Sequence, residues 1–467
     1  MNRVTSIILL ITFSVFYIVY SFSIDNPSYD NLKLLGTAGL IQYLISVYSS
    51  IKNGQRLISP YIVFLTVLFI FQAGQSLMYP FDIISKRDLV GFIDITTVDV
   101  FNAQVVTFSF LAFFQIGSLL CRINRNKIGK SEQTELIQKN RLIQIGWFLA
   151  IISIYPYYQE LIHNVLLSLL RGYGALYEGD VKIGLANLQS MIADYFIPSV
   201  ICLYIGYRKN KSARTIITAI LLLNCTIILV TGGRTEAVII LALLLILRNY
   251  LVKKFNKKEL SLIAVAGVLV LILLAGISQM RSNTSRSFEE TFAINDKNSS
   301  NGAVDAIGEM GSSMFCQIWT EDILSKTNQY RYGSSYLYAL TTVIPNLGFW
   351  EIHPAKEHAN LSHWLTTEKG FSFGTGYSMV AEAYINFWVF GAFMMMFLGF
   401  GLTKIFGMLG NAITGRNIAF TAFILVFFWF SLKLPRNSFI GAVRAIFYFA
   451  LPIYWYTRGY IIKRSNS

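Results

Sequence analysis

The sequence predicts an all-α integral membrane protein that crosses the bilayer many times and forms one domain over residues 1–467. Three observations support this fold class. Hydrophobic residues make up 54% of the chain and charged residues only 14%, and the mean hydropathy is +0.52. The apolar residues form runs of the length that a membrane-crossing helix needs. Between these runs, basic residues recur in every second connection.

A window of about twenty residues finds about twelve predicted spans. The first follows Arg3 and lacks a cleavage site of small residues, so we interpret it as a retained anchor rather than a signal peptide. An even number of spans places both termini on the same side of the membrane. In order, the predicted spans cover 4–22, 34–51, 58–80, 101–121, 142–160, 187–207, 214–231, 236–252, 260–280, 376–403, 417–434 and 439–457.

The formal net charge of +14 lies mainly in short connections between the predicted spans. Its larger groups stand at 122–141, 208–214 and 253–258. With twelve spans these connections share one side of the membrane, and the positive-inside rule makes that side the cytoplasm, together with both termini. The basic charge therefore marks membrane orientation. We predict a lipid bilayer, and no nucleic acid, as the partner of these residues.

Two of the predicted outer segments are long enough to hold structure of their own. The smaller, 161–186, carries a short helical apolar stripe and then glycines among tyrosines. The larger, 281–375, stands between the ninth and tenth spans and holds three of the four histidines. Helix-compatible patterns over 303–324 and 336–344 predict helices that lie against the outer membrane face. A loop of this size on one side is expected to handle a substrate there.

A Gly-Gly-Arg turn follows the seventh predicted span, within Thr231–Glu236. Glycines allow close backbone approach, and the next helix exposes free N–H groups at its start. Arg234 adds a planar fork suited to phosphate oxygens. The pattern predicts an anion site. A tight interhelical turn, with Arg234 snorkelling and Glu236 as an N-terminal cap, explains the same residues equally well.

Four further arginines stand near the outer membrane surface. Arg281 and Arg286 follow the ninth span, Arg436 ends the eleventh, and Arg444 lies within the twelfth. An arginine within a span usually faces the bundle interior and marks a functional path. Binding to ordinary lipid headgroups explains any one of these arginines well, but it explains the group less well.

Glu382 and Asn386 stand four residues apart near the start of the tenth span, so they share one helix face about two turns below the outer surface. A carboxylate at that depth is a candidate general base, because ionisable groups within membranes are usually functional. The alternative is structural: Glu382 would pair with a neighbouring arginine and hold helices together.

The loop histidines His353, His358 and His363 stand five residues apart each time. That step does not bring them to one face of a helix, and Pro354 disfavours a helix where the series begins. We therefore predict no metal site and no cofactor. A sugar-binding or acid–base role for His353 and His358 and a plain surface role both stay open. The chain also lacks a phosphate-binding loop and a GxSxG motif.

With these features the chain resembles the Wzy-type O-antigen and capsule repeat-unit polymerases. The shared layout is about a dozen spans, the Gly-Gly-Arg turn and one large late external loop. Short motifs fit as well: Tyr332-Gly-Ser-Ser-Tyr336, Gly-x-Gly-Tyr-Ser-x-x-x-Glu382 with Asn386, and Arg436-Asn-Ser. The Arg-x10-Gly repeat of some members is absent, since Lys182 and Phe292 stand where its glycines would be.

The resemblance implies a GT-C-like fold and a metal-independent glycosyltransferase at the outer face of a bacterial inner membrane. It would transfer a growing glycan from undecaprenyl diphosphate to another undecaprenyl-diphosphate-linked oligosaccharide, with a chain-length regulator as a possible partner. Arginines would stabilise the diphosphate. In this scheme Glu382, Arg281, His353 and His358 are catalytic. Arg234, Arg286, Arg436 and Arg444 bind the diphosphate, and Tyr332, Tyr336 and Asn386 bind sugar.

Two other functions are compatible with the sequence. A flippase or other transporter of lipid-linked glycans would also be basic and apolar, but such carriers usually show internal repeats and short external loops. An O-antigen ligase would share the arginine group and differ only in its acceptor. The polymerase is our first hypothesis.

Overall fold

The structure of the protein is a computed structural model that describes residues 2–86, 89, 94–123, 130–171, 185–231, 233–262, 307–308, 310–344, 350–371 and 374–459. Within these residues the regular structure is helical throughout, with no strand. Nine helical segments of the described chain are long and apolar enough to cross a membrane. These observations confirm the predicted all-α polytopic fold.

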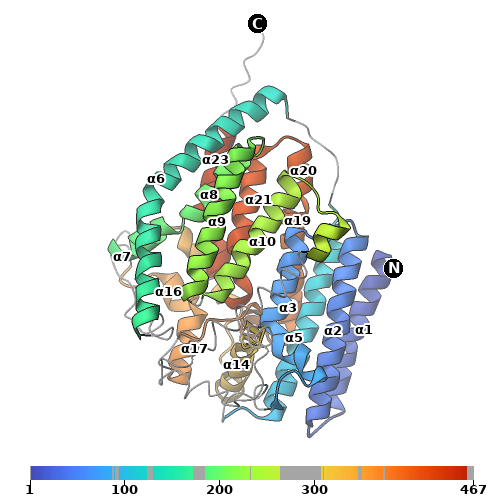
Figure 1. Ribbon diagram of the computed structural model, residues 1–467. Helices are drawn as coiled ribbons and strands as arrows, with labels where there is room; N and C mark the ends of the chain where they lie inside the picture. Colours follow the sequence, from blue (N-terminus) through green and yellow to red (C-terminus); the bar gives the residue numbers. More distant parts are fainter. Residues whose placement is uncertain are drawn as a thin grey trace.

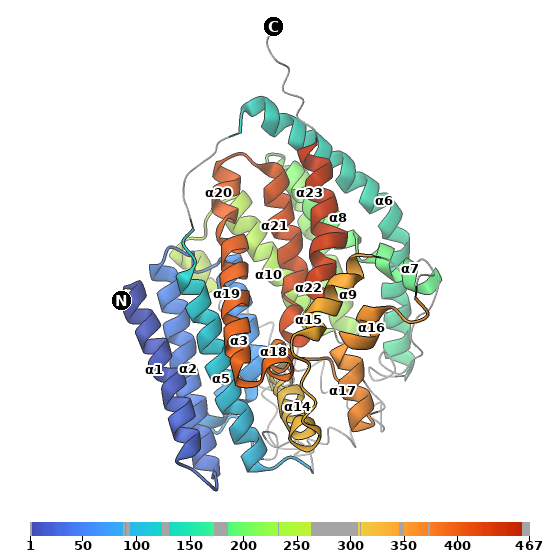
Figure 2. The same ribbon diagram turned by 180° about the vertical axis from the view of Figure 1, so that it is seen from behind.

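The N-terminal helices form one side of the bundle (Figures 1 and 2). They are α1 (Arg3–Phe22), α2 (Tyr29–Lys52), α3 (Pro60–Met78) with the short η1 (Tyr79–Phe81), and α5 (Thr97–Leu120). Buried polar groups join them. Gln115 of α5 accepts a hydrogen bond from the Tyr61 hydroxyl (2.6 Å) and donates to Ser49 and Ser50 of α2. In an apolar bundle such paired groups fix how the helices face one another.

The middle of the chain begins with α6 (Glu132–Arg171), a helix of 40 residues that runs obliquely along the outside of the bundle (Figure 1). It is followed by α7 (Leu185–Ala193), α8 (Phe196–Gly206), α9 (Lys211–Thr231) and α10 (Arg234–Leu251). The predicted outer segment 161–186 is therefore helical up to Arg171, and residues 172–184 lie outside the described part of the chain.

Helices α14 (Met314–Thr327), α15 (Ser334–Leu340), α16 (Pro354–His358) and α17 (Leu361–Lys369) belong to the large loop. The short η3 (Thr341–Val343) follows α15. The helices gather at one end of the bundle (Figure 2). Helix α14 packs against α5 and α18, so this part of the loop is held on the membrane helices.

The C-terminal part of the chain contains α18 (Met379–Phe387), η4 (Trp388–Phe390), α19 (Gly391–Gly407), α20 (Leu409–Thr414) and α21 (Ile418–Ser431). The chain then passes through η5 (Leu434–Arg436), α22 (Ile440–Arg444), the π-helical η6 (Ala445–Ala450) and α23 (Leu451–Arg458). The predicted span 376–403 is thus two helices separated by η4, not one continuous helix.

Helices α5 and α19 approach each other closely enough that only glycine fits at the contact. A Cβ atom on Gly117 would lie 1.9 Å from the carbonyl oxygen of Met396, and one on Gly399 would lie 1.9 Å from that of Phe114. These neighbours are backbone atoms of helices and cannot turn aside. The two glycines therefore join the N-terminal and C-terminal parts of the bundle.

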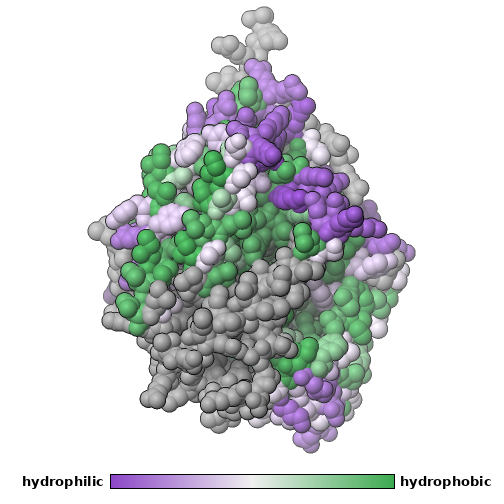
Figure 3. Space-filling view, viewed as in Figure 1, coloured by the Kyte–Doolittle hydropathy of each residue, from purple (hydrophilic) through white to green (hydrophobic). Residues whose placement is uncertain are grey.

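The outer surface agrees with a membrane location. An apolar band separates polar regions near the two ends of the helices (Figure 3). The predicted spans 142–160 and 439–457 are helical but are not among the nine apolar segments, and 260–280 lies almost wholly outside the described residues. The number of spans therefore stays a prediction.

Candidate functional site

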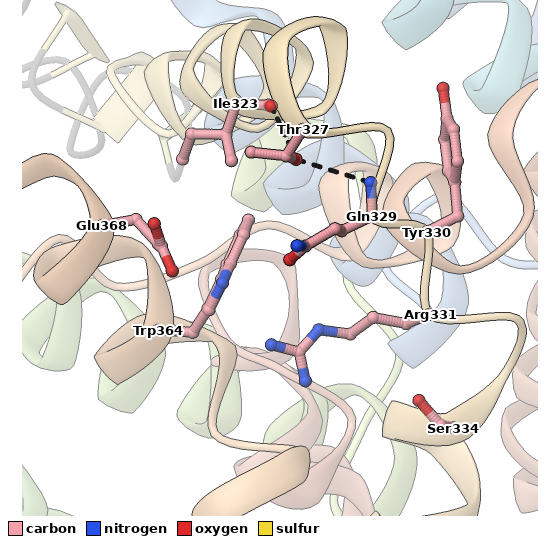
Figure 4. Close-up of a pocket in the computed structure, with 8 residues that line it drawn as sticks. All are labelled: Ile323, Thr327, Gln329, Tyr330, Arg331, Ser334, Trp364 and Glu368. Atoms are coloured by element: carbon pink, nitrogen blue, oxygen red, sulfur yellow. Dashed lines mark hydrogen bonds between the residues drawn. The ribbon is translucent and has the colours of Figure 1, made fainter.

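A polar cavity of about 280 Å³ lies among the loop helices, between α14, the segment that follows it, α15 and α17 (Figure 4). Aliphatic carbon contributes little to its wall, and aromatic, amide and charged side chains dominate. Its lining residues are Ile323, Thr327, Gln329, Tyr330, Arg331, Ser334, Trp364 and Glu368.

The wall between α14 and α15 is shaped by residues with left-handed backbone. Helix α14 ends at Asn328 (φ 53°), and Tyr332 (φ 50°) and Gly333 (φ 86°) turn the chain into α15. A Cβ atom on Gly333 would also lie 3.1 Å from the Phe387 ring. The left-handed backbone therefore favours glycine there, and a side chain would also press on the Phe387 ring. The turn seats Arg331 against α18, where its N–H donates to the carbonyl of Ile385 (2.9 Å).

Arg331 provides the positive charge of the cavity. Its Nη1 donates to the carbonyl of His358 (2.7 Å), and its guanidinium carbon lies 5.3 Å from the centre of the Trp364 ring. No carboxylate of the described residues lies within ion-pair distance. Burial lowers the pKa of Arg331, but a guanidinium still stays charged at neutral pH. Its other guanidinium N–H groups have no hydrogen-bond partner among the described residues.

Three further side chains are directed at the same space. In Figure 4 the amide of Gln329 and the carboxylate of Glu368 both lie beside the Trp364 ring, with the Arg331 guanidinium below them. An aromatic face with amide, carboxylate and guanidinium groups around it suits a ligand that has apolar C–H faces and hydroxyl groups. A sugar ring is such a ligand.

A second acidic group stands on α14. Glu321 is half-buried and accepts a hydrogen bond from the Gln317 amide (2.6 Å). Burial raises the pKa of Glu321 to about 8, and the negative charge of Asp99 adds to the shift. This carboxyl therefore keeps its proton near neutral pH.

Glu382 and Asn386 lie behind the cavity wall and do not line it. Glu382 is 1% exposed. One carboxylate oxygen accepts a hydrogen bond from the Ser335 hydroxyl (2.9 Å) and the other accepts from the Phe439 N–H (2.6 Å). The Asn386 amide donates to Ser335 Oγ (2.8 Å) and to the Glu382 carbonyl (2.7 Å). As predicted, the two residues share one helix face, but no arginine of the described chain pairs with Glu382.

The network around Glu382 supports the cavity from behind. Ser335 follows the lining residue Ser334 on α15, and Phe439 leads into α22. Two buried atoms close by, the Tyr336 hydroxyl and Asn386 Oδ1, have no hydrogen-bond partner among the described residues. Tyr336 stacks on Phe387 (6.1 Å between ring centres) and does not line the cavity. Tyr332, next to Arg331 in the chain, is 81% exposed and does not line the cavity either.

The predicted arginine group is only partly brought together. The backbone of Arg234 begins α10, and its side chain is outside the described part. Glu236, two residues on, lies 3.8 Å from Lys433 Nζ, so the start of α10 is near η5 and Arg436. Arg436 is half-buried beside Gly376 and Arg444 is exposed on α22, and neither lines the cavity. Arg281 and Arg286 lie outside the described residues.

His353 and His358 stand at the two ends of α16, and His363 lies in α17. His353 Nδ1 accepts a hydrogen bond from the N–H of Ala355 and caps α16, so Nε2 carries the proton and donates to the Ile344 carbonyl (3.0 Å). The His358 ring lies against Tyr338, and its carbonyl holds Arg331. No group of three His, Cys, Asp or Glu residues in the described chain is arranged to hold a metal ion.

The sequence reasoning missed Arg331, Gln329, Glu368 and Glu321. One signal was available, because Arg331 stands between two tyrosines and directly before the Gly333 turn. The aromatic residues of the cavity are Trp364 and Tyr330, whereas the predicted sugar contacts Tyr332, Tyr336 and Asn386 do not line it.

A second polar cavity, of about 510 Å³, lies at the opposite end of the bundle, near the start of α6 and the end of α20 (Figure 1). Its arginines are paired with carboxylates of α6. Arg208 contacts Glu135 (2.5 Å), and Arg416 contacts Glu132 (2.9 Å). The remaining lining residues are Leu136, Lys139, Gly206, Lys209, Ile413 and Thr414.

The fold is that of a polytopic α-helical membrane protein, with a polar cavity at one end of its helices. The family model of the O-antigen polysaccharide polymerase Wzy matches residues 4–463, nearly the whole chain, and the protein therefore belongs to this family. The predicted resemblance is confirmed. Membership places the protein in polysaccharide biosynthesis at a membrane, as a polymerase that acts on lipid-linked oligosaccharide repeat units. No curated protein and no solved structure matches the chain.

Proposed function

We propose that the protein extends O-antigen or capsule chains at the outer face of a bacterial inner membrane, with both termini in the cytoplasm and without a metal ion. It transfers the growing glycan from undecaprenyl diphosphate to the sugar end of a second lipid-linked repeat unit. The observation that carries the proposal is the Arg331–Trp364 cavity. It combines a cation that has no carboxylate partner among the described residues with an aromatic platform, in the loop predicted to face outward.

The reaction exchanges one bond at the anomeric carbon of the donor. The bond from that carbon to the diphosphate oxygen breaks, and the electron pair leaves with undecaprenyl diphosphate. A new bond forms to an acceptor hydroxyl oxygen, whose proton passes to a base. The leaving group gains negative charge, so fixed cations nearby lower the barrier. Arg331 has free N–H groups for this purpose.

We assign the sugar next to the reacting bond to the cavity. Trp364 would contact its C–H face, and Gln329 and Arg331 would donate to its oxygens. Glu368 is the carboxylate that faces this space, and we propose it as the base. Arg436 and Arg444, with Arg234 and Arg286, stay proposed diphosphate ligands, and Arg281 stays a proposed catalytic residue. Tyr332 at the edge is a proposed sugar contact.

For Glu382 the geometry favours a positioning role. Both of its oxygens accept hydrogen bonds from protein groups, and it fixes α15 against α18 and the start of α22. His353 likewise uses both ring nitrogens in capping α16. We propose that Glu382, Asn386, Tyr336, His353 and His358 hold the cavity wall in place, and that Arg331 and Glu368 contact the substrate.

The test uses purified protein, a synthetic undecaprenyl-diphosphate repeat unit and a chelator, with no nucleotide. A product ladder that rises by whole repeat units supports the proposal. Transfer of glycan to a different lipid without a ladder would indicate a ligase. Transport of the intact substrate across vesicles, with no new product, would indicate a flippase.

A pair of tryptophan variants connects the activity to the cavity. Trp364→Ala should lower the yield of polymer about tenfold or more, because the platform is lost. Trp147→Ala removes an exposed ring on α6, far along the chain from the cavity, and should retain the ladder. Equal activity of the two variants would overturn the assignment of the cavity.

A further inference from the structure

An exposed aromatic face surrounds the break in the tenth predicted span. It consists of Trp388, Phe390, Phe393 and Phe397, whose exposed fractions are 51%, 65%, 49% and 66%. Phe390 and Phe393 stack on each other with 6.5 Å between ring centres. Three of the rings recur at helical spacing down one side of α19, so they form a continuous strip that begins at η4.

Contact with ordinary lipid does not require aromatic rings. Helix α1 is also a membrane helix with one exposed face, and that face is aliphatic along most of its length: Val4, Ile8, Ile11, Val15, Ile18 and Val19. The strip on α19 therefore differs in chemistry from a surface of the same molecule that has the same exposure.

The backbone at the top of the strip is held in a costly conformation. Trp388 has φ 50° and ψ −133°, a region that residues with a side chain rarely adopt. Gly391 explains how the chain turns there, since a Cβ atom on it would lie 2.5 Å from the carbonyl oxygen of Ala383. Strained residues of this kind occur mainly at functional sites, where the rest of the structure maintains them.

The aromatic face is continuous with the polar cavity. Tyr384 of α18 lies between the cavity residue Tyr330 and Trp388, close enough to each for side-chain hydrogen bonding. Arg331 is bonded through its backbone to Ile385. The last turn of α18 thus has the cation of the cavity at one side and the exposed rings at the other. This arrangement fits an amphiphile with an anionic headgroup and a long apolar tail.

We propose that the aromatic face binds the polyprenyl chain of the lipid-linked substrate, next to the headgroup and sugars at the cavity. The inference depends on the proposed function for the identity of this lipid. A polyprenyl chain carries methyl branches and double bonds, so its C–H groups and alkenes meet aromatic ring faces repeatedly. Straight acyl chains lack this pattern, and an aromatic strip therefore favours the substrate over bulk lipid.

The test compares two lipids that share a headgroup and differ in chain length. Full-length protein in detergent is titrated with undecaprenyl diphosphate and with geranyl diphosphate, and binding is read by native mass spectrometry. The quantity of interest is the Kd for geranyl diphosphate divided by the Kd for undecaprenyl diphosphate, which measures the preference for the long chain. In Phe390→Leu/Phe397→Leu, which keeps the surface apolar, this ratio should fall about tenfold relative to the wild type.

A matched control changes two exposed phenylalanines elsewhere. Phe22→Leu/Phe148→Leu, on α1 and α6, alters side chains that are 85% and 59% exposed and should leave the ratio within about twofold. An unchanged ratio in Phe390→Leu/Phe397→Leu, or an equal loss in the control, would overturn the proposal. If Phe390→Leu/Phe397→Leu leaves the ratio unchanged but causes an oligomer of the protein to dissociate, the aromatic face contacts a second copy of the chain and the proposal is overturned.

This binding test is independent of catalysis. If the wild type yields no polymer ladder, the proposed function fails while the chain-length ratio still supports or overturns the polyprenyl site. If the ladder forms and the ratio is insensitive to the aromatic face, only the polyprenyl site fails.

Discussion

The two cavities described above both contain arginine, but the arginines differ in whether a carboxylate pairs with them. At the end near α20, Arg208 and Arg416 are both paired with carboxylates of α6. At the end formed by the large loop, Arg331 has no carboxylate partner among the described residues, and donates to one carbonyl beside a tryptophan ring. An arginine whose charge is satisfied within the protein holds helices together. One whose charge is unsatisfied is available to a ligand.

The paired arginines are expected to contribute to stability, and Arg331 is expected to contribute to function. The paired arginines tie the start of α6 to α8 and α20, so losing one leaves a carboxylate uncompensated. Arg331 contributes its backbone to the cavity wall and its guanidinium to the open space. Substitutions at each cavity can therefore test whether the paired and unpaired arginines have different roles.

The largest expected effect is at Arg331. Arg331→Ala should lower kcat/KM for polymerisation about 100-fold or more, since a preorganised donor to the leaving group is lost, with little change in melting temperature. Arg208→Ala should do the reverse, because its side chain and that of Glu135 are largely buried: about 3 kcal/mol of stability lost and activity of the folded fraction retained. Ladder assays and thermal unfolding of both variants check this. Equal losses of activity in Arg331→Ala and Arg208→Ala would show that the two arginines do not differ in role.

A smaller effect is expected at Glu382. Gln offers one acceptor oxygen where the carboxylate offers two, so Glu382→Gln should loosen α15 and lower kcat/KM about tenfold, mainly through KM. The pH profile of kcat should keep its shape. Glu135→Gln is the control at the other end and should affect stability alone. A collapse of kcat by several orders of magnitude without loss of stability would identify Glu382 as the base itself.

The next prediction concerns pH and Glu321. Because burial raises the pKa of folded Glu321 to about 8 from an ordinary value of 4.5, the folded state binds more protons than the unfolded state between these values. Its stabilising effect is complete below pH 4.5 and is lost as pH rises towards 8. Glu321→Gln should flatten the decline of melting temperature over this range. Parallel curves for wild type and variant would show that Glu321 ionises normally.

The smallest effect is expected at Arg416, whose backbone is left-handed (φ 55°). Arg416→Gly loses the ion pair with the exposed Glu132 and a longer contact with Glu135 (3.5 Å), together worth about 1 kcal/mol because Arg416 itself is half exposed. It also relieves backbone strain of about 1 kcal/mol. The melting temperature should therefore stay the same or rise slightly. A fall of several degrees would mean that Arg416 clamps α6 as strongly as Arg208 does.

The sequence predicted the fold class because membrane helices must satisfy their backbone within long apolar runs, and such runs are visible in one dimension. It also predicted that Glu382 and Asn386 share a face, since an interval of four residues is local to one helix. The break at Trp388 was not predictable. The run from Ala383 to Gly391 contains no proline, and the bend comes from packing of α18 against α19.

The cavity was harder to predict for a related reason. Arg331 stands before α15, whereas Trp364 and Glu368 lie four residues apart on α17, and nothing in the local sequence shows that these two segments face one space. The loop histidines were conspicuous by type, but in the structure His353 caps a helix and His358 supplies a carbonyl to Arg331. The type of a residue indicated what chemistry it could perform. Its place relative to the cavity depended on contacts between distant parts of the chain, which the sequence does not show.

The glycine contact between α5 and α19 has a consequence for genetics. Every missense change at Gly117 or Gly399 adds a Cβ where a helix backbone already lies. A screen for strains that fail to make polymer should therefore recover alleles at these two codons as readily as alleles at Arg331, although neither codon encodes a residue of the cavity. Protein abundance would separate the two classes, because the glycine alleles should be degraded and the Arg331 alleles should accumulate.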